Sequence, residues 1–271
     1  HLCKAHFIAD FESKAKRAIR NHRWIKPKDR IAVALSGGKN SSALLYFLKK
    51  ILGTRRDVRL SAIFIDEGTK GNRDCHVAAN IADAIGVELI TGSFEEVFGK
   101  TIDKVVMEKG DRFSCTFCRV LRGKCLNRIA HDHDMTKLAL AINLDDEAQN
   151  VLVNVFRGDP ERLLKPADTL AEIVPIIRPF LPIPAREVAL YAYLHVEGFE
   201  IRQCPHSHNA LINDVHSLLN DYTWRHPSTK YAIVNLSEQL VSYGFMPGTH
   251  ADICPVRGES DLSEYRPCRM L

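Results

Sequence analysis

The chain has 271 residues, of which 45% are hydrophobic and 26% charged, with a formal net charge of +4. This composition is typical of a globular protein. It contains no run of eighteen apolar residues and no basic–apolar–small leader, so we expect neither a membrane span nor a secretory signal, and we expect a cytoplasmic protein. In that compartment, eight cysteines favour metal or redox chemistry over disulfides.

The N-terminal segment combines a possible metal site with a basic helix. Cys3 and His6 have the spacing of half a zinc site. Apolar residues between His6 and Trp24 recur at helical spacing, which predicts one long helix leading into the first strand. Eight cations crowd this segment: Lys14, Lys16, Arg17, Arg20, Arg23, Lys26, Lys28 and Arg30. Such a cluster is typical of a surface that binds RNA, although a solvated helix face gives the same pattern.

The most informative stretch is a glycine-containing turn at residues 36–42, Ser-Gly-Gly-Lys-Asn-Ser-Ser. Residues 31–35 before it form a short apolar run that predicts a buried parallel strand, and residues 43–50 after it predict a helix. A strand, a turn and a helix bring backbone N–H groups and the positive end of a helix to one point, which suits a phosphate. Lys39 adds a cation, but the spacing is not that of a Walker A loop.

The remaining elements alternate between strands and helices. We expect strands at residues 60–65, 87–91, 137–141 and 173–177, and helices at residues 72–85, 94–106, 142–156, 185–196, 209–222 and 230–243. This alternation predicts an α/β protein with a doubly wound parallel sheet. Ligands bind at the carboxyl edge of such sheets, so the turn at residues 66–68 should border the site. The acidic run at residues 145–147 suits either a first helical turn or a site.

The cysteines allow three interpretations. Cys115 and Cys118 form a Cys-x-x-Cys motif, and Cys204 lies far downstream. A thioredoxin-type pair is disfavoured because the motif lies in mid-domain. A structural zinc site would need a fourth ligand, which Cys125, His206 or His208 could supply. A three-cysteine iron–sulfur cluster would leave one iron without a protein ligand. We expect Cys75 and Cys125 to pack in the core.

Several motifs occur together in a specific order: Ser-Gly-Gly-Lys-x-Ser, Cys-x-x-Cys, Asn-Leu-Asp-Asp-Glu-Ala-Gln at residues 143–149, and a late cysteine. With the N-terminal Cys-x-x-His-Phe, the chain resembles the PP-loop tRNA 2-thiolation enzymes of the TtuA/NcsA type from Cys3 to Cys268. The resemblance implies an adenine nucleotide alpha hydrolase-like fold with a helical C-terminal extension and remnant zinc-finger segments at both ends. The implied division is 1–24, 25–182, 183–243 and 244–271.

The resemblance also implies residue roles. The phosphates and adenine of ATP would be bound by Ala34, Leu35, Ser36, Gly37, Gly38, Lys39, Asn40, Ser41, Ser42, Ile65, Arg122 and Ala141. Catalysis would involve Lys39, Asn40, Arg122, Asp145 and Asp146. A 4Fe–4S cluster would be held by Cys115, Cys118 and Cys204. Zinc would be held by Cys3 and His6 in part, and by Cys254 and Cys268 if that site persists.

The chain departs from the family pattern at several positions. Asn40 stands in place of an aspartate, Arg119 in place of a glycine, and Ala141-Ile142 in place of Gly-His. The C-terminal segment keeps one cysteine of each of two Cys-x-x-Cys pairs, Cys254 and Cys268. We therefore expect the C-terminal zinc to be lost. The alternative is one composite site shared with the N-terminal pair.

The resemblance implies ATP-dependent thiolation of a tRNA uridine. The C2 oxygen would attack the α phosphate of ATP, Lys39 and Mg²⁺ would stabilise the departing pyrophosphate, and sulfur would then displace AMP. The implied partners are tRNA, a sulfur donor (a thiocarboxylated ubiquitin-like protein or sulfide) and a second copy of the chain, with no membrane. The alternatives are a cluster-free adenylating tRNA-modifying enzyme and an impaired relative that binds tRNA or carries sulfur.

Overall fold

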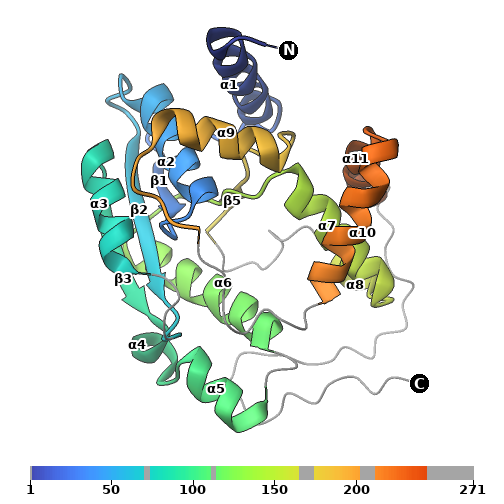
Figure 1. Ribbon diagram of the computed structural model, residues 1–271. Helices are drawn as coiled ribbons and strands as arrows, with labels where there is room; N and C mark the ends of the chain where they lie inside the picture. The colour runs from blue at the N-terminus through green and yellow to red at the C-terminus, as the bar shows by residue number, and fades with distance from the viewer. Residues whose placement is uncertain (1, 70–73, 111–113, 165–173, 202–210, 243–271) are drawn as a thin grey trace.

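The computed structural model describes residues 2–69, 74–110, 114–164, 174–201 and 211–242 (Figure 1). These residues build one five-stranded parallel sheet with the order β3-β2-β1-β4-β5. The strands are β1 (Arg30–Ala34), β2 (Arg59–Asp66), β3 (Glu88–Ser93), β4 (Lys137–Ala139) and β5 (Ile176–Ile177). The predicted doubly wound sheet is confirmed. Its order reverses between β1 and β4, which is the position at which open α/β sheets bind ligands, in the crevice outside the carboxyl ends of the strands.

Helices cover both faces of the sheet, and a further group lies beyond β5 (Figure 1). The first core is formed with α1 (Lys4–Asn21), α2 (Lys39–Leu52), α3 (Cys75–Ile85) and α9 (Ala185–His195). The second core is formed with α4 (Phe94–Phe98), α5 (Ile102–Lys109) and α6 (Ser114–Asp132). Around α7 (Leu144–Phe156) lie α8 (Pro160–Leu164), α10 (Leu211–Arg225) and α11 (Thr229–Ser242). The central strands supply both cores, because alternate residues point to opposite faces: Ile31 and Val33 enter the first core and Ala32 the second.

Two helical segments differ from the sequence prediction. The helix expected at residues 94–106 is two helices, because Gly99 ends α4 at a left-handed φ of +66° and the Thr101 hydroxyl caps α5. The 19-residue helix α6 was not predicted, although Leu121, Cys125 and Leu126 repeat at helical spacing and pack in the second core. The expected core position of Cys125 is confirmed.

The expectation for Cys75 was wrong, since its side chain is exposed at the first position of α3. The loop-rich stretch after Gly158 contains one short helix, α8, that was not predicted. Within the part of the chain that the structure describes, no helix is both long and apolar enough to span a bilayer.

A buried carboxylate joins the N-terminal helix to the helix that follows the glycine turn. Glu12 on α1 accepts hydrogen bonds from Lys50 Nζ on α2 at 2.6 Å and from the Tyr191 hydroxyl on α9 at 3.0 Å. Its side chain is 9% exposed. The rings of Phe11 and Tyr191 stack beside it, 4.1 Å apart. Helix α1 is therefore fixed to the same body as the glycine turn.

Replacing Glu12 with alanine should destabilise the protein, because Lys50 and Tyr191 lose their partner in a nearly dry site. We expect the free energy of unfolding to fall by about 3 kcal/mol in chemical denaturation at pH 7. The exposed Asp10 on the same helix is the matched control, and Asp10→Ala should cost less than about 1 kcal/mol. Equal losses in the two variants would contradict this account.

The Glu12 contribution should also depend on pH. Burial raises the pKa of Glu12, but hydrogen bonds from Lys50, Tyr191 and Lys16 outweigh it and hold the pKa below its usual value of 4.5. The stabilisation is therefore present above pH 4.5 and is lost as the pH falls through the lowered pKa. The stability difference between wild type and Glu12→Ala should shrink correspondingly in acid.

Candidate functional site

The glycine turn lies between β1 and α2 and presents the first N–H groups of that helix. Gly38 is the N-cap residue of α2, and no side chain caps the helix there. The open end of the helix can therefore receive an anion. Gly37 has φ +76°, and a Cβ at this position would lie 3.1 Å from Val77 Cγ1. The turn thus needs glycine for its conformation and its packing.

Two serines of α2 hold the turn in shape. The Ser41 hydroxyl accepts a hydrogen bond from the Ser36 N–H at 3.1 Å and donates to the Gly38 carbonyl at 3.0 Å. The Ser42 hydroxyl donates to the same carbonyl at 2.9 Å. Because both hydroxyls are engaged inside the loop, they act as braces that fix the direction of the open N–H groups.

A second chain segment braces the turn from outside. The N–H of Glu200 donates to the Gly37 carbonyl at 3.0 Å, and Glu200 pairs with Gly38 in a parallel bridge. This contact joins residues more than 160 positions apart, and nothing local in the sequence indicates it. It fixes the point from which the segment carrying Cys204 begins, although Cys204 itself lies outside the described residues.

The acidic run forms the first turn of α7, directly after β4. Asn143 is the N-cap residue, and its Oδ1 accepts hydrogen bonds from the N–H groups of Asp145 at 2.9 Å and Asp146 at 3.0 Å. Asp146 Oδ2 accepts the Asn143 N–H in return, which completes a capping box. Asn143 is fully buried, and its Nδ2 has no partner among the described residues. The helix-capping interpretation of this run is confirmed.

The two aspartates have different surroundings. Asp145 Oδ2 accepts the Ala185 N–H of α9 at 2.8 Å, and Asp145 Oδ1 accepts from Lys230 Nζ of α11. Lys230 also donates to Asn220 Oδ1 of α10 at 2.7 Å. Both carboxylate oxygens of Asp145 thus bind protein donors, and this side chain connects α7 directly to α9 and α11, and through Lys230 to α10. Sequence reasoning missed Lys230, which lies 85 positions away.

Asp146 is exposed as a residue in the first turn of α7, although protein surrounds much of its carboxylate. Burial raises its pKa to about 6, and the charges of Asp145 and Glu147 act in the same direction. The Asn143 N–H and the Lys39 ammonium oppose this rise. Because β1 and β4 are adjacent and parallel, the glycine turn and the acidic turn that follow them leave the same edge of the sheet.

The Cys-x-x-Cys motif occupies the start of α6 on the opposite face of the sheet. Cys115 lies in the first turn of this helix, and Cys118 follows one turn later with a buried side chain. Cys118 Sγ accepts a hydrogen bond from Arg122 Nη2 at 3.1 Å, and Arg122 Nε binds Glu67 at the end of β2. A guanidinium beside a thiol favours the thiolate, which is the form that binds metals.

The other predicted nucleotide residues lie around the same crevice. Ala34 ends β1 and Leu35 follows it, Ile65 is a buried residue near the end of β2, and Ala141 lies between β4 and α7. Three neighbouring strands therefore bring these positions to one edge of the sheet. Asn40, in the first turn of α2, has a buried Oδ1 with no partner in the described ranges.

The predicted zinc residues are only partly described. Cys3 Sγ and His6 Nδ1 lie 3.1 Å apart on the exposed start of α1, so the two proposed ligands do converge. Cys254 and Cys268 lie outside the described residues, as do His206 and His208. Residues 2–69, 74–110, 114–164, 174–201 and 211–242 contain no group of three or more His, Cys, Asp or Glu side chains arranged to hold a metal.

Comparison with known proteins identifies the family. A PP-loop domain model matches residues 8–203. The tRNA 2-thiolation protein NcsA of Haloferax volcanii is 34% identical over 262 residues, covering 89% of this chain and 81% of its own. Cytoplasmic tRNA 2-thiolation protein 1 of Anopheles gambiae is 30% identical, covering 99% of this chain and 80% of its own.

Solved structures agree with these sequence matches. The U34-tRNA thiolase NcsA of Methanococcus maripaludis, solved with its [4Fe-4S] cluster, has a TM-score of 0.81 at 30% identity. The match covers 90% of this chain and 81% of that one. An NMN synthetase from Francisella tularensis shares the fold alone, with a TM-score of 0.52 at 12% identity. The chain belongs to the PP-loop family of tRNA 2-thiolation proteins.

Proposed function

We propose that this protein catalyses ATP-dependent 2-thiolation of a uridine in tRNA. The observation that carries the proposal is the meeting of an uncapped helix end and an acidic turn at the reversal of the sheet order, in a chain of this family. One side can bind the phosphates of ATP, and the other presents a carboxylate to the reacting base. A cytoplasmic location is proposed from the names of the insect relatives.

The glycine turn would bind ATP through its backbone. The open N–H groups in the first turn of α2 and the Lys39 ammonium would neutralise the charge that grows on pyrophosphate as it departs. The buried Oδ1 of Asn40 is an oxygen acceptor with no protein partner in the described residues, which fits a Mg²⁺ ion held on the nucleotide. An amide oxygen at this position would bind the ion more weakly than a carboxylate.

Asp146 would take up a proton in the first chemical step. As the uridine C2 oxygen bonds to the α phosphorus, the bond to the bridging oxygen breaks and pyrophosphate leaves. The N3 proton of the uridine must then be accepted by a base. A carboxylate with a pKa of about 6 is mostly ionised at neutral pH and is a stronger base than an ordinary aspartate. Sulfur then attacks C2, and AMP leaves.

Cys115, Cys118 and Cys204 would hold the 4Fe–4S cluster. The contact between Cys118 Sγ and Arg122 favours the thiolate required of a ligand. The hydrogen bond from Glu200 to Gly37 holds Glu200, four residues before Cys204, beside the glycine turn. When bound, the cluster would supply an iron without a protein ligand, at which sulfur can be held. Burial of Cys118 keeps water from this position.

Other features of the proposal come from the family resemblance and from α1. The exposed cations of α1 would bind the tRNA backbone, and Cys3 and His6 would supply half of a zinc site. A thiocarboxylated ubiquitin-like protein or sulfide would donate sulfur, and the protein would act as a homodimer.

The thiolation proposal is tested by Cys118→Ser. We expect the anaerobically reconstituted variant to lose iron, sulfide and cluster absorbance together with tRNA thiolation, while ATP binding stays within about twofold of wild type. The exposed Cys75 provides the matched control, and Cys75→Ala should retain both cluster and activity. A Cys118→Ser protein that keeps its iron and thiolates tRNA would refute the assignment.

The pKa of Asp146 can be measured directly. In the ligand-free protein, its side-chain carboxyl carbon should titrate near pH 6 by NMR, against 3.8 for an ordinary aspartate. Because the folded state raises this pKa, its contribution to stability is complete below pH 3.8 and is lost as the pH rises through about 6. Asp146→Asn should remove both the NMR transition and this part of the pH dependence.

Replacing Asp145 and replacing Asp146 should have different effects, the first on stability and the second on the rate of the reaction. Asp145→Asn leaves the nearly buried Lys230 ammonium without its counter-charge, so we expect unfolding to become easier by about 3 kcal/mol. Asp146→Asn should leave stability at pH 7 unchanged or slightly higher, and should slow AMP formation about 100-fold because the base is removed. The opposite pattern, with Asp146 needed for folding and Asp145 for rate, would reverse the assignment.

A further inference from the structure

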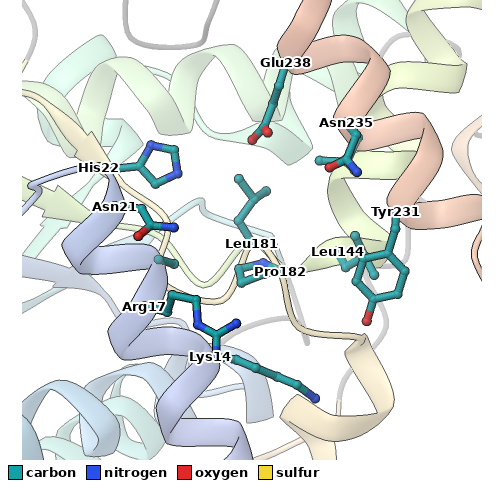
Figure 2. Close-up of a pocket in the computed structure, with 12 residues that line it drawn as sticks. Lys14, Arg17, Asn21, His22, Leu144, Leu181, Pro182, Tyr231, Asn235 and Glu238 are labelled. Atoms are coloured by element: carbon teal, nitrogen blue, oxygen red, sulfur yellow. The ribbon is translucent and has the colours of Figure 1, made fainter.

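A pocket of about 210 Å³ lies outside the proposed ATP site, between α1 and α11 (Figure 2). Figure 2 shows Arg17 and Asn21 of α1, with the following residue His22, on one side, and Asn235 and Glu238 of α11 on the other. Lys14 and Tyr231 also line the pocket, and its apolar side chains are Ala18, Leu144, Leu181, Pro182 and Val234.

The lining suits one flat, partly polar ring system. Pockets for drug-sized ligands measure roughly 300–1,000 Å³, so this smaller volume favours a single group. An apolar floor can pack against the face of a ring, while the amides of Asn21 and Asn235 and the carboxylate of Glu238 can bind donors and acceptors along its edge. A nucleobase has this combination of an apolar face and a polar edge.

The charges around the pocket favour an RNA backbone at its entrance. Lys14 is neutralised by Asp10 at 2.6 Å and Glu187 at 3.0 Å, so it adds little net charge. Arg17 has no ion pair within the described part of the chain. It is exposed on α1 close in sequence to two other exposed cations, Lys16 and Arg20. A phosphate bound at Arg17 would place its attached base at the mouth of the pocket.

The pocket also adjoins the proposed reaction centre. Leu144, the first residue of α7, contributes to the floor and directly precedes Asp145 and Asp146 in the sequence. RNA that presents a uridine to Asp146 and lies along α1 would therefore pass this opening. Unstacked bases are the form in which proteins read single-stranded RNA, and extrusion of one base loosens the stacking of its neighbours.

We propose that the pocket between α1 and α11 binds one unstacked base of the substrate tRNA, close to the modified uridine, with its phosphate on Arg17. The proposal rests on the tRNA thiolation function and identifies a second contact for the same substrate. Glu238 accepts hydrogen bonds from the base, which favours a base whose edge carries an amino or ring N–H group. Asn21 and Asn235 hold the base from the two sides.

The test compares single alanine variants of the full chain for binding to an unmodified transcript of a substrate tRNA, by fluorescence anisotropy at several salt concentrations. We expect Asn235→Ala and Glu238→Ala each to weaken binding about 10-fold with an unchanged salt slope, since they contact a base. Arg17→Ala should weaken binding and reduce the salt slope by about 1, since it contacts a phosphate. Leu236, 57% exposed on α11 and outside the pocket lining, is the control and should bind as wild type after Leu236→Ala.

Glu238→Ala separates a base contact from general electrostatics. Removing a negative charge would strengthen RNA binding if only long-range charge mattered, so a loss of affinity supports direct contact with the base. Wild-type affinity in both Asn235→Ala and Glu238→Ala would overturn the pocket proposal alone, because the wild type would still bind and thiolate tRNA. Failure of the wild type to bind tRNA would instead overturn the proposed function. Unchanged thermal unfolding would exclude misfolding as the cause of any loss.

Discussion

The parallel pairing of β1 with β4 is the constraint on which the site depends. Ala32 is in register with Leu138 and Val33 with Ala139, so the two strands end at the same edge of the sheet. The chain leaves β1 into α2 and leaves β4 into α7, and each helix begins at that edge. Two helix N-termini therefore meet in the crevice, where their dipoles favour negative charge.

The N-termini of α2 and α7 differ in their capping. At α2, Gly38 offers no side chain, so the end stays open for a phosphate. At α7, Asn143 and Asp146 close the end with a capping box. In the proposed function, the open end of α2 would bind the phosphates of ATP, and the capping carboxylate of Asp146 would act as the base beside it.

Asp145 explains how the helical extension supports this arrangement. Its two oxygens bind the start of α9 and Lys230 of α11, so the direction of α7 is fixed by helices far away in the sequence. A charge that is enclosed and fully paired contributes specificity of geometry more than net stability. The neighbouring Asp146 accepts the Asn143 N–H of its own helix cap and keeps a raised pKa. Adjacent identical residues thus acquire structural and chemical roles from their surroundings.

Local sequence patterns predicted most strands and helices, but they did not predict contacts between residues that lie far apart in the sequence. The sequence predicts the strand–turn–helix order, the glycine turn and the acidic first turn of α7, because each depends on residues that are close in the chain. Helix α6 was not predicted, although its apolar residues have helical spacing. Cys118 and Cys125 belong to this apolar stripe, but cysteines at these positions also suit metal ligands, and this hid the pattern. The Lys230 and Glu200 contacts span 85 residues or more, and no periodicity encodes such pairs.

Two buried polar atoms mark the side of the crevice that should receive a ligand. Asn40 Oδ1 in α2 and Asn143 Nδ2 at the cap of α7 lack partners among the described residues. A buried polar group without a hydrogen bond costs about 1–3 kcal/mol, which a structure retains only where the group has a use. The atoms lie on the two turns that leave the same edge of the sheet, one an acceptor and one a donor. In the proposed function, a bound nucleotide and its metal would supply the missing partners of both atoms, and these contacts would contribute to the binding free energy.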